Sequence, residues 1–144
     1  MTPAAALHAL CPWSPPALVE RAGAAAKRAE KRRRVDPLLV AAMIRAESRC
    51  DPDAVNPRTG AAGLLQVLPV HWRGRWDPFD VDANVAEGVR LFARYARRCG
   101  NVAGALSLYG GLGSCAPSAW SAKVLGLRAR FAPKLAIAEG GSTP

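Results

Sequence analysis

Residues 35–50 read VDPLLVAAMIRAESRC and carry the clearest helix signal in the chain. Asp36 suits an N-cap, and Pro37 suits the first helical position because it needs no backbone N–H there. Apolar side chains then recur at helical spacing, with Leu39 and Met43 one turn apart. The stretch therefore predicts a helix that buries one face.

Glu47 lies on the same face of this helix as Leu39 and Met43, because residues four apart lie above one another. Burial disfavours the ionised form of a carboxyl group and so raises its pKa, which suits a general acid near neutral pH. Periodicity alone leaves an alternative open. Glu47 could instead stand at the edge of the stripe, near the helix C-terminus, and reach solvent.

The composition favours one mainly helical domain. The chain has 144 residues, which is long enough to bury a core, and 50% of them are hydrophobic. Alanine is abundant, aromatic residues are few, and no stretch alternates apolar and polar residues as a half-buried strand does.

The chain divides into three parts by composition. We expect an irregular Pro-rich arm over residues 1–16, a domain over 17–132 and a flexible tail over 133–144. Loops are expected at 51–60 and 69–78 because both are rich in turn-forming residues. The expected helices cover about residues 16–34, 36–49, 61–68, 80–98, 101–109 and 118–131.

The net charge of +9 indicates an anionic partner such as nucleic acid, an anionic membrane or a polymer of the cell envelope. The densest positive run, residues 27–34, reads best as a solvated helix face. No recognised nucleic-acid-binding module accompanies it, so nucleic acid is the least favoured partner. No apolar run is long enough to cross a membrane, and no convincing signal peptide is present, so the route of export is not evident.

The four cysteines allow three disulfide pairings. Cys99 with Cys115 would close the shortest loop, and Cys11 with Cys50 would then fasten the N-terminal arm to the end of the Glu47 helix. An even count fits an oxidising compartment, whereas four reduced thiols remain the alternative. The cysteines show no zinc-ligand spacing, so no metal site is expected.

Four segments resemble the catalytic domain of soluble lytic transglycosylases, in the goose-type lysozyme superfamily. In chain order they are VDPLLVAAMIRAES, GAAGLLQVLP, DPFDVDANVAEGVRLF and ALSLYGG, which together cover about residues 35–113. Each is weak alone, but the order and spacing match the family. The resemblance implies a lysozyme-like helical fold.

Glu47 matches the single catalytic Glu of that family. The resemblance implies cleavage of the β-1,4 bond between N-acetylmuramic acid and N-acetylglucosamine, with one carboxyl group acting first as acid and then as base. Most glycosidases use two carboxyl groups. Here the acetamido group of the substrate would stabilise the developing positive charge, and the muramyl 6-hydroxyl would attack within the same sugar. The product is then a 1,6-anhydromuramyl end.

Five further residues match family positions around the substrate: Ser48, Gly63, Gln66, Asn84 and Tyr109. Ser48 would hold the sugar or orient Glu47, with a back-bonding Ser as the alternative. Gln66 can donate and accept hydrogen bonds to sugar, with a surface Gln as the alternative. Gly63 would allow close approach to the backbone.

The remaining matches lie on two later helices. Asn84 is expected to make structural hydrogen bonds near the cleft, and Gly88 is expected to allow close packing. The hydroxyl of Tyr109 would orient the catalytic Glu, with a core aromatic as the alternative. Gly110 and Gly111 depart from the Asn and Ala usual after this Tyr, so the sugar contacts expected there are in doubt.

Three acidic residues, Asp77, Asp80 and Asp82, are candidates for a second carboxylate, but turn and N-cap roles are favoured for all of them. Trp72 and Trp76 could line a sugar cleft, although core packing is favoured.

The sequence therefore predicts a peptidoglycan lytic transglycosylase that acts as a monomer on the cell wall, in the periplasm or outside the cell. The resemblance implies no metal or organic cofactor, and the lack of a long apolar run predicts no stable membrane insertion. A phage or a secretion apparatus is a candidate assembly for the chain. The alternatives are a hydrolytic muramidase of the same fold and a non-catalytic module that binds glycan or nucleic acid.

Overall fold

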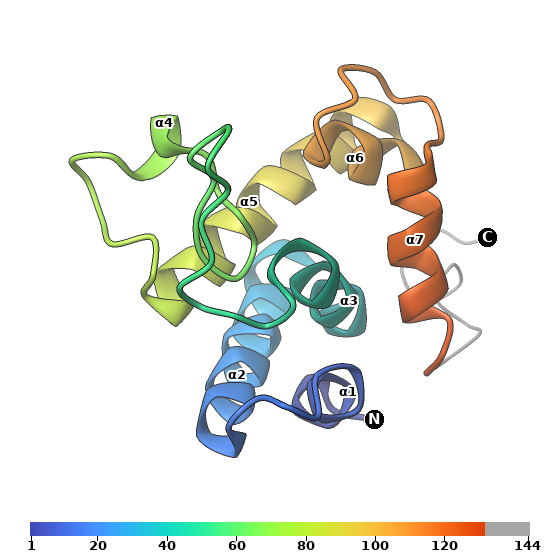
Figure 1. Cartoon of the computed structure of the whole chain (residues 1–144). Helices are drawn as coiled ribbons and strands as arrows, with labels where there is room; N and C mark the ends of the chain where they lie inside the picture. Colours follow the sequence, from blue (N-terminus) through green and yellow to red (C-terminus); the bar gives the residue numbers. More distant parts are fainter. Residues whose placement is uncertain (132–144) are drawn as a thin grey trace.

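The computed structural model describes residues 1–131, and this part of the chain holds seven helices and no strand (Figure 1). This confirms the prediction of a mainly helical fold. None of the helices in the described part is long and apolar enough to cross a membrane. The helices are α1 (Pro3–Leu10), α2 (Pro16–Arg33), α3 (Pro37–Ser48), α4 (Pro69–Trp72), α5 (Val81–Cys99), α6 (Val102–Tyr109) and α7 (Ala119–Arg128).

α3 lies at the centre of the molecule and packs against α1, α2 and α7 (Figure 1). Its start follows the prediction, because the side chain of Asp36 accepts a hydrogen bond from the backbone N–H of Leu38 and Pro37 is the first helical residue. Nine of its twelve residues are buried. Leu39 and Met43 are almost fully removed from water, which gives about 1.5–3 kcal/mol of stabilisation per side chain.

The prediction of an irregular N-terminal arm is wrong over Pro3–Leu10, which form α1. The hydroxyl of Thr2 accepts from the backbone N–H of Ala5 and caps the helix. Ala6, Leu7 and Leu10 are buried against the neighbouring helices. A helix this short is not stable by itself, so its sequence signal is weak and packing against α2 and α3 supplies its stability.

Two disulfides join the described cysteines in the pairing that the sequence favoured. Cys11–Cys50 ties the end of α1 to the end of α3, and Cys99–Cys115 ties the end of α5 to the segment before α7. The division of the chain at residues 16 and 132 stays a prediction. The proposed tail over 133–144 lies outside the described residues.

The prediction of a helix over residues 61–68 is also wrong. Ala62 and Val67 instead exchange two backbone hydrogen bonds of 3.0 Å and close a tight turn. Gly63 (φ +80°) and Gln66 (φ +49°) are left-handed, a conformation that an α-helix does not contain. We expected a loop over residues 69–78, but its first residues, Pro69–Trp72, form the short helix α4.

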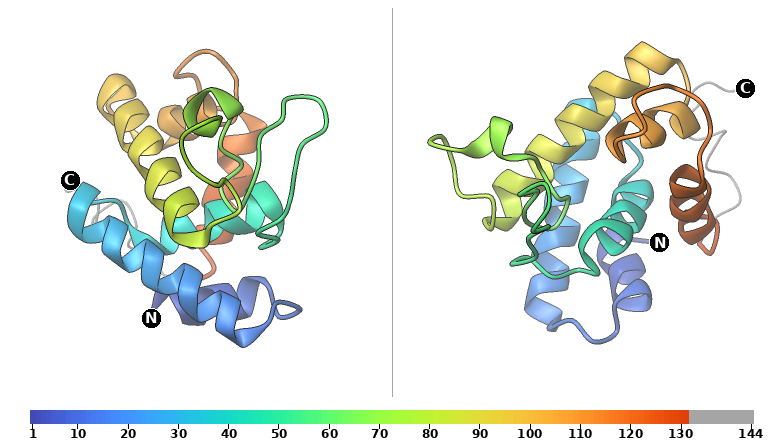
Figure 2. Two further views of the ribbon diagram at one scale, coloured as in Figure 1. Left: turned by 90° about the vertical axis from the view of Figure 1, so that its left-hand side faces the viewer. Right: turned by 45° about the horizontal axis from the view of Figure 1, so that its top comes forward.

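α5 runs along α2 on one side and carries α6 on the other, and α6 leads to α7 (Figures 1 and 2). α7 is fastened to the start of α3 because the buried Arg128 guanidinium pairs with the same Asp36 carboxylate that caps α3. The loop between α3 and α4 extends from the end of α3 (Figure 2). The end of α3 is therefore flanked by this loop and by α7.

Candidate active site

Glu47 lines a cleft of ≈ 450 Å³ at the end of α3. The volume lies in the range of about 300–1,000 Å³ that is typical of ligand sites. One wall comes from the loop after α3, through Ala54, Val55 and Asn56, and another comes from Lys123 of α7. The helix stripe predicted from Leu39 and Met43 therefore ends in an open cleft, not in the core.

The carboxyl group of Glu47 is set up to carry a proton near neutral pH. Burial raises the pKa of Glu47 to about 8, and the positive charge of Lys123 acts in the opposite direction. The carboxyl group makes no hydrogen bond and no ion pair with any described residue. Its side chain is partly exposed to the cleft, so the proton can reach a bound ligand.

Glu47 is the only carboxyl group that lines this cleft in the described part of the chain. Two of the three Asp candidates have the turn and N-cap roles that were favoured for them, and Asp82 has a different structural role. Asp77 accepts from the N–H of Phe79 in a turn, and Asp80 caps α5 by accepting from Ala83. Asp82 pairs with Arg28 at 2.7 Å, away from the cleft.

Ser48 and Gln66 both line the cleft beside Glu47. The hydroxyl of Ser48 donates its hydrogen bond to the backbone carbonyl of Ile44, one turn earlier in the helix, as expected for a back-bonding Ser. The side-chain amide of Gln66 donates to the carbonyls of Ala54 and Gly63, both at 3.1 Å. Its amide oxygen accepts from no described donor, which leaves an acceptor at the wall of the cleft.

Gly63 and Asn84 do not line the cleft; they hold the turn that carries Gln66. Asn84 is buried and accepts from the N–H of Leu65 at 2.7 Å. Its amide donates to the carbonyls of Ala62 and Pro78, both at 2.9 Å. A Cβ on Gly63 would collide with this amide and with the Pro78 carbonyl.

Tyr109 lies close to Glu47, but its hydroxyl forms a hydrogen bond with the turn that carries Gln66. Its hydroxyl donates to the carbonyl of Leu65 at 2.7 Å. Burial and, to a lesser extent, the nearby charge of Glu47 raise the pKa of Tyr109 well above its usual range. Gly88 allows this contact, because a Cβ there would meet the side chain of Leu65 and the Tyr109 hydroxyl. The close packing expected of Gly88 is thus present.

We predict that Tyr109→Phe lowers the free energy of unfolding by about 1–2 kcal/mol, because the carbonyl of Leu65 loses its donor. Urea denaturation of both proteins measures the difference. Tyr95→Phe is the matched control, because Tyr95 packs edge-on against Tyr109 and its hydroxyl has no hydrogen-bond partner among the described residues. Equal losses in the two variants would contradict the role of the Tyr109 hydroxyl.

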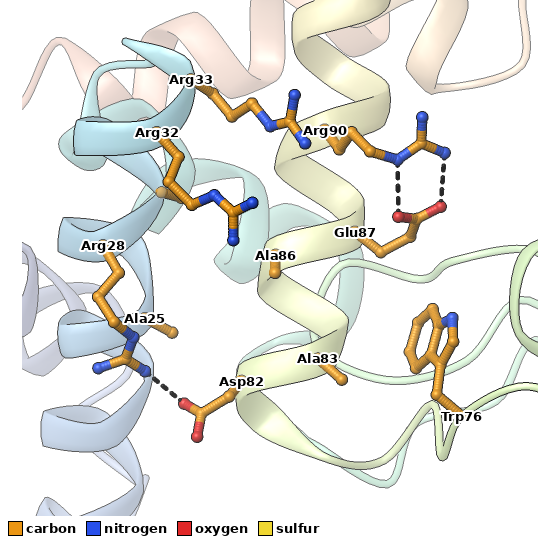
Figure 3. Close-up of a pocket in the computed structure, with 11 residues that line it drawn as sticks. Ala25, Arg28, Arg32, Arg33, Trp76, Asp82, Ala83, Ala86, Glu87 and Arg90 are labelled. Carbon is orange, nitrogen blue, oxygen red and sulfur yellow. Dashed lines mark hydrogen bonds and ion pairs between the residues drawn. The ribbon is translucent and has the colours of Figure 1, made fainter.

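A second groove, of ≈ 430 Å³, separates α2 from α5 (Figure 3). Its two carboxylates are already paired, Asp82 with Arg28 and Glu87 with both nitrogens of the Arg90 fork. The hydrogen bonds from Arg90 hold the pKa of Glu87 below its usual range. The lowered pKa makes Glu87 unsuited to proton donation, so the cleft at Glu47 is the better candidate for acid chemistry.

Trp72 and Trp76 do not line the Glu47 cleft. Both pack against the core, and their indole N–H groups donate to the carbonyls of Val67 and His71. Within residues 1–131, no three His, Cys, Asp or Glu side chains gather as a metal site would require.

Sequence reasoning missed the basic residues of the cleft, namely Arg45, Arg49, Arg58 and Lys123. The first two flank Glu47 in the sequence and could have been noticed. Arg58 and Lys123 come from a loop and from α7, and only the tertiary structure brings them to Glu47.

The helical fold, with Glu47 as the one carboxyl group among the described residues that line the cleft, is lysozyme-like. Residues 24–121, more than half of the chain, match the family described as the transglycosylase SLT domain, so the chain belongs to this family of peptidoglycan transglycosylases. Searches among curated proteins and among solved structures found no match.

Proposed function

We propose that this chain is a lytic transglycosylase that cleaves the β-1,4 bond between N-acetylmuramic acid and N-acetylglucosamine. One observation carries the proposal: Glu47, whose pKa is raised to about 8, is the only carboxyl group among the described residues that line the cleft. Family membership supports peptidoglycan as the substrate. The two disulfides fit an oxidising compartment outside the cytoplasm.

In the proposed reaction Glu47 donates its proton to the glycosidic oxygen as the bond from this oxygen to the muramyl C1 breaks. The acetamido group of the substrate stabilises the positive charge at C1. The Glu47 carboxylate then takes the proton of the muramyl 6-hydroxyl, whose oxygen bonds to C1. Glu47 ends protonated as it began, so the cycle balances without water.

The absence of a second carboxyl group along the described cleft favours this route over hydrolysis. An inverting or retaining hydrolase of the usual kind needs a second carboxylate to activate water or to attack C1. Intramolecular attack needs only that the sugar be held in the right orientation. We propose that the Gln66 amide oxygen and Ser48 contact the sugar, while Gly63, Asn84 and Tyr109 position Gln66 through the turn.

Mass spectrometry of peptidoglycan digested by the protein tests the proposal. A transglycosylase releases anhydro-muropeptides, which are lighter by one water than hydrolysis products. Products with only reducing ends would identify a muramidase of the same fold. No released products at all would leave the chain as a non-catalytic module.

We predict that Lys123→Gln moves the alkaline limb of the pH–rate profile to higher pH. The reaction needs protonated Glu47, so kcat/KM should fall as pH rises through about 8. The charge of Lys123 favours the carboxylate and lowers the pKa of Glu47. Its removal therefore raises this pKa and extends activity to more alkaline pH.

The measurement is kcat/KM on soluble glycan strands from pH 5 to 10. Lys31→Gln, which removes the same charge from an exposed site on α2, is the control and should leave the limb in place. A limb that moves equally in both variants, or to lower pH in Lys123→Gln, contradicts the assignment of the limb to Glu47.

A further inference from the structure

Three guanidinium groups lie near one another without a counterion among the described residues, and two of them line the Glu47 cleft. Arg45 and Arg49 lie on the last turn and the C-cap of α3, and Arg130 follows α7. None of them lies within ion-pair distance of a described carboxylate. Burial and the neighbouring charges of Arg49 and Arg130 lower the pKa of Arg45. Such like charges repel, so a fold that keeps them together favours the binding of an anion.

The indole of Trp13 holds two of these groups in place. The guanidinium of Arg45 lies 5.1 Å from the ring centroid of Trp13, and that of Arg49 lies 5.0 Å from it. The indole N–H also donates to the Arg49 carbonyl at 3.1 Å, and the Arg45 Nε donates to the carbonyl of Leu10 at 3.1 Å. The Cys11–Cys50 disulfide fastens the same segment to the end of α3. The guanidiniums are thus pre-positioned, unlike those of a freely solvated face.

This cluster opens into the Glu47 cleft. Arg45 and Arg49 line one edge, and Arg58 and Lys123 add two more cations to the lining. The one carboxyl group among the described lining residues, Glu47, is largely protonated at neutral pH, because burial raises its pKa to about 8. The cleft is therefore strongly positive where a substrate would enter.

Part of the cluster lies outside the matched family domain. Trp13 and Arg130 stand before and after residues 24–121, and Cys11 also precedes them. Some of the residues that organise the two arginines thus lie outside the range that matches the family.

We infer that the edge formed by Arg45, Arg49 and Arg58 binds the free carboxylates of the peptide stems that peptidoglycan strands carry. This inference rests on the proposed function, because it names the part of the substrate that the cleft selects. The planar fork of Arg matches a carboxylate with two parallel hydrogen bonds. The stem hangs from the muramyl residue whose glycosidic bond is cleaved, so its carboxylates lie within reach of the cleft. A glycan without charged groups could not form ion pairs with these arginines.

The test compares two preparations of the same glycan strands. In one the stems are intact. In the other carbodiimide coupling to ammonia has turned the stem carboxylates into amides, which keeps the size and removes the charge. We measure kcat/KM on both for the wild type, Arg49→Gln and Arg58→Gln. Arg97→Gln is the matched control, because Arg97 is an exposed residue near the end of α5 that lies outside the cleft and has no ion pair among the described residues.

The wild type should cleave the intact strands several-fold faster than the amidated ones, since each exposed ion pair contributes little and the effects of the arginines combine. Arg49→Gln and Arg58→Gln should each lose much of this preference, which appears as a larger fall in kcat/KM on the intact strands than on the amidated ones. Arg58 lies in an exposed loop, so its replacement does not threaten the fold. Arg97→Gln should keep the full preference.

Two results would overturn the inference. One is a wild type that cleaves both preparations equally well, and the other is an Arg97→Gln variant that loses as much preference as Arg49→Gln, which would indicate only a general attraction of charge. Either outcome leaves the proposed function intact, because turnover is still seen. Loss of turnover on both preparations by the wild type would instead count against the proposed function.

Discussion

Glu47→Gln is expected to lower kcat on peptidoglycan by about 10³-fold or more, since removal of a general acid that also serves as base costs at least this order. The amide keeps the shape of the carboxyl group but has no proton of suitable acidity. No second carboxyl group among the described lining residues can take over the role. Binding to insoluble peptidoglycan, measured by co-sedimentation, should persist, because the rest of the cleft is unchanged.

The same substitution should stabilise the fold in alkaline solution. The folded-state pKa of Glu47, about 8, is higher than the value near 4.5 of an exposed Glu. Between these values the folded state holds a proton that the unfolded state has released, so stability falls as pH rises through this window. A Gln side chain does not titrate, so the substitution removes this contribution to the pH dependence of stability. Glu47→Gln should therefore match the wild type at pH 4 and exceed it by a few kcal/mol at pH 9.

Urea denaturation at the two pH values measures this difference. Glu30→Gln, which removes a carboxylate from an exposed i,i+3 pair with Lys27, is the control and should change little at either pH. Unchanged turnover in Glu47→Gln would refute the catalytic role of Glu47. Equal stability of wild type and variant at pH 9 would show that the carboxyl group is not desolvated.

Gly63→Ala is expected to lower the free energy of unfolding by about 4 kcal/mol or more, as the sum of a left-handed backbone cost and a severe overlap. The backbone at Gly63 has φ +80°. The new methyl would collide with the backbone carbonyl of Pro78 and with the Asn84 amide, which is buried and held by three hydrogen bonds. Asn84 holds three backbone groups of this region, so its displacement leaves buried polar atoms without partners.

Gly74→Ala separates the two causes. Gly74 has nearly the same φ, +75°, but no atom lies within 4 Å of where its Cβ would stand. This control should cost only about 1 kcal/mol, because just the backbone term remains. Thermal or urea denaturation of both variants gives the comparison. Similar losses at the two positions would mean that the turn can yield around Gly63 and that its packing is not as tight as the geometry indicates.

The sequence predicted the structure of α3 most completely. Its N-cap, its first proline and its buried stripe are all local signals, and each is found where it was predicted. Two of the wrong assignments, the irregular arm and the helix over residues 61–68, have one physical cause. In α1 and in the turn over residues 61–68, contacts with distant parts of the chain override weak local preferences.

At the candidate active site, too, some features follow from local sequence and others only from tertiary contacts. The pattern on α3 determined that a carboxyl group would stand on an apolar face, and the order of the motifs determined the family. Only the tertiary structure decided what surrounds Glu47. Asn84 of α5 and Tyr109 of α6 hydrogen-bond to the turn over residues 62–67 and do not line the cleft. Lys123 and Arg58 enter the cleft from segments that lie far from Glu47 in the sequence.

Periodicity and capping act over one or two turns of a helix, so residues 35–50 could reveal their own structure and the placement of Glu47. The field at that carboxyl group depends on burial and on charges brought from many places in the chain. The sequence alone therefore identified the candidate proton donor. Its raised pKa and its positive surroundings are set by the packing of α7, the loop after α3 and the disulfide-bound N-terminal segment.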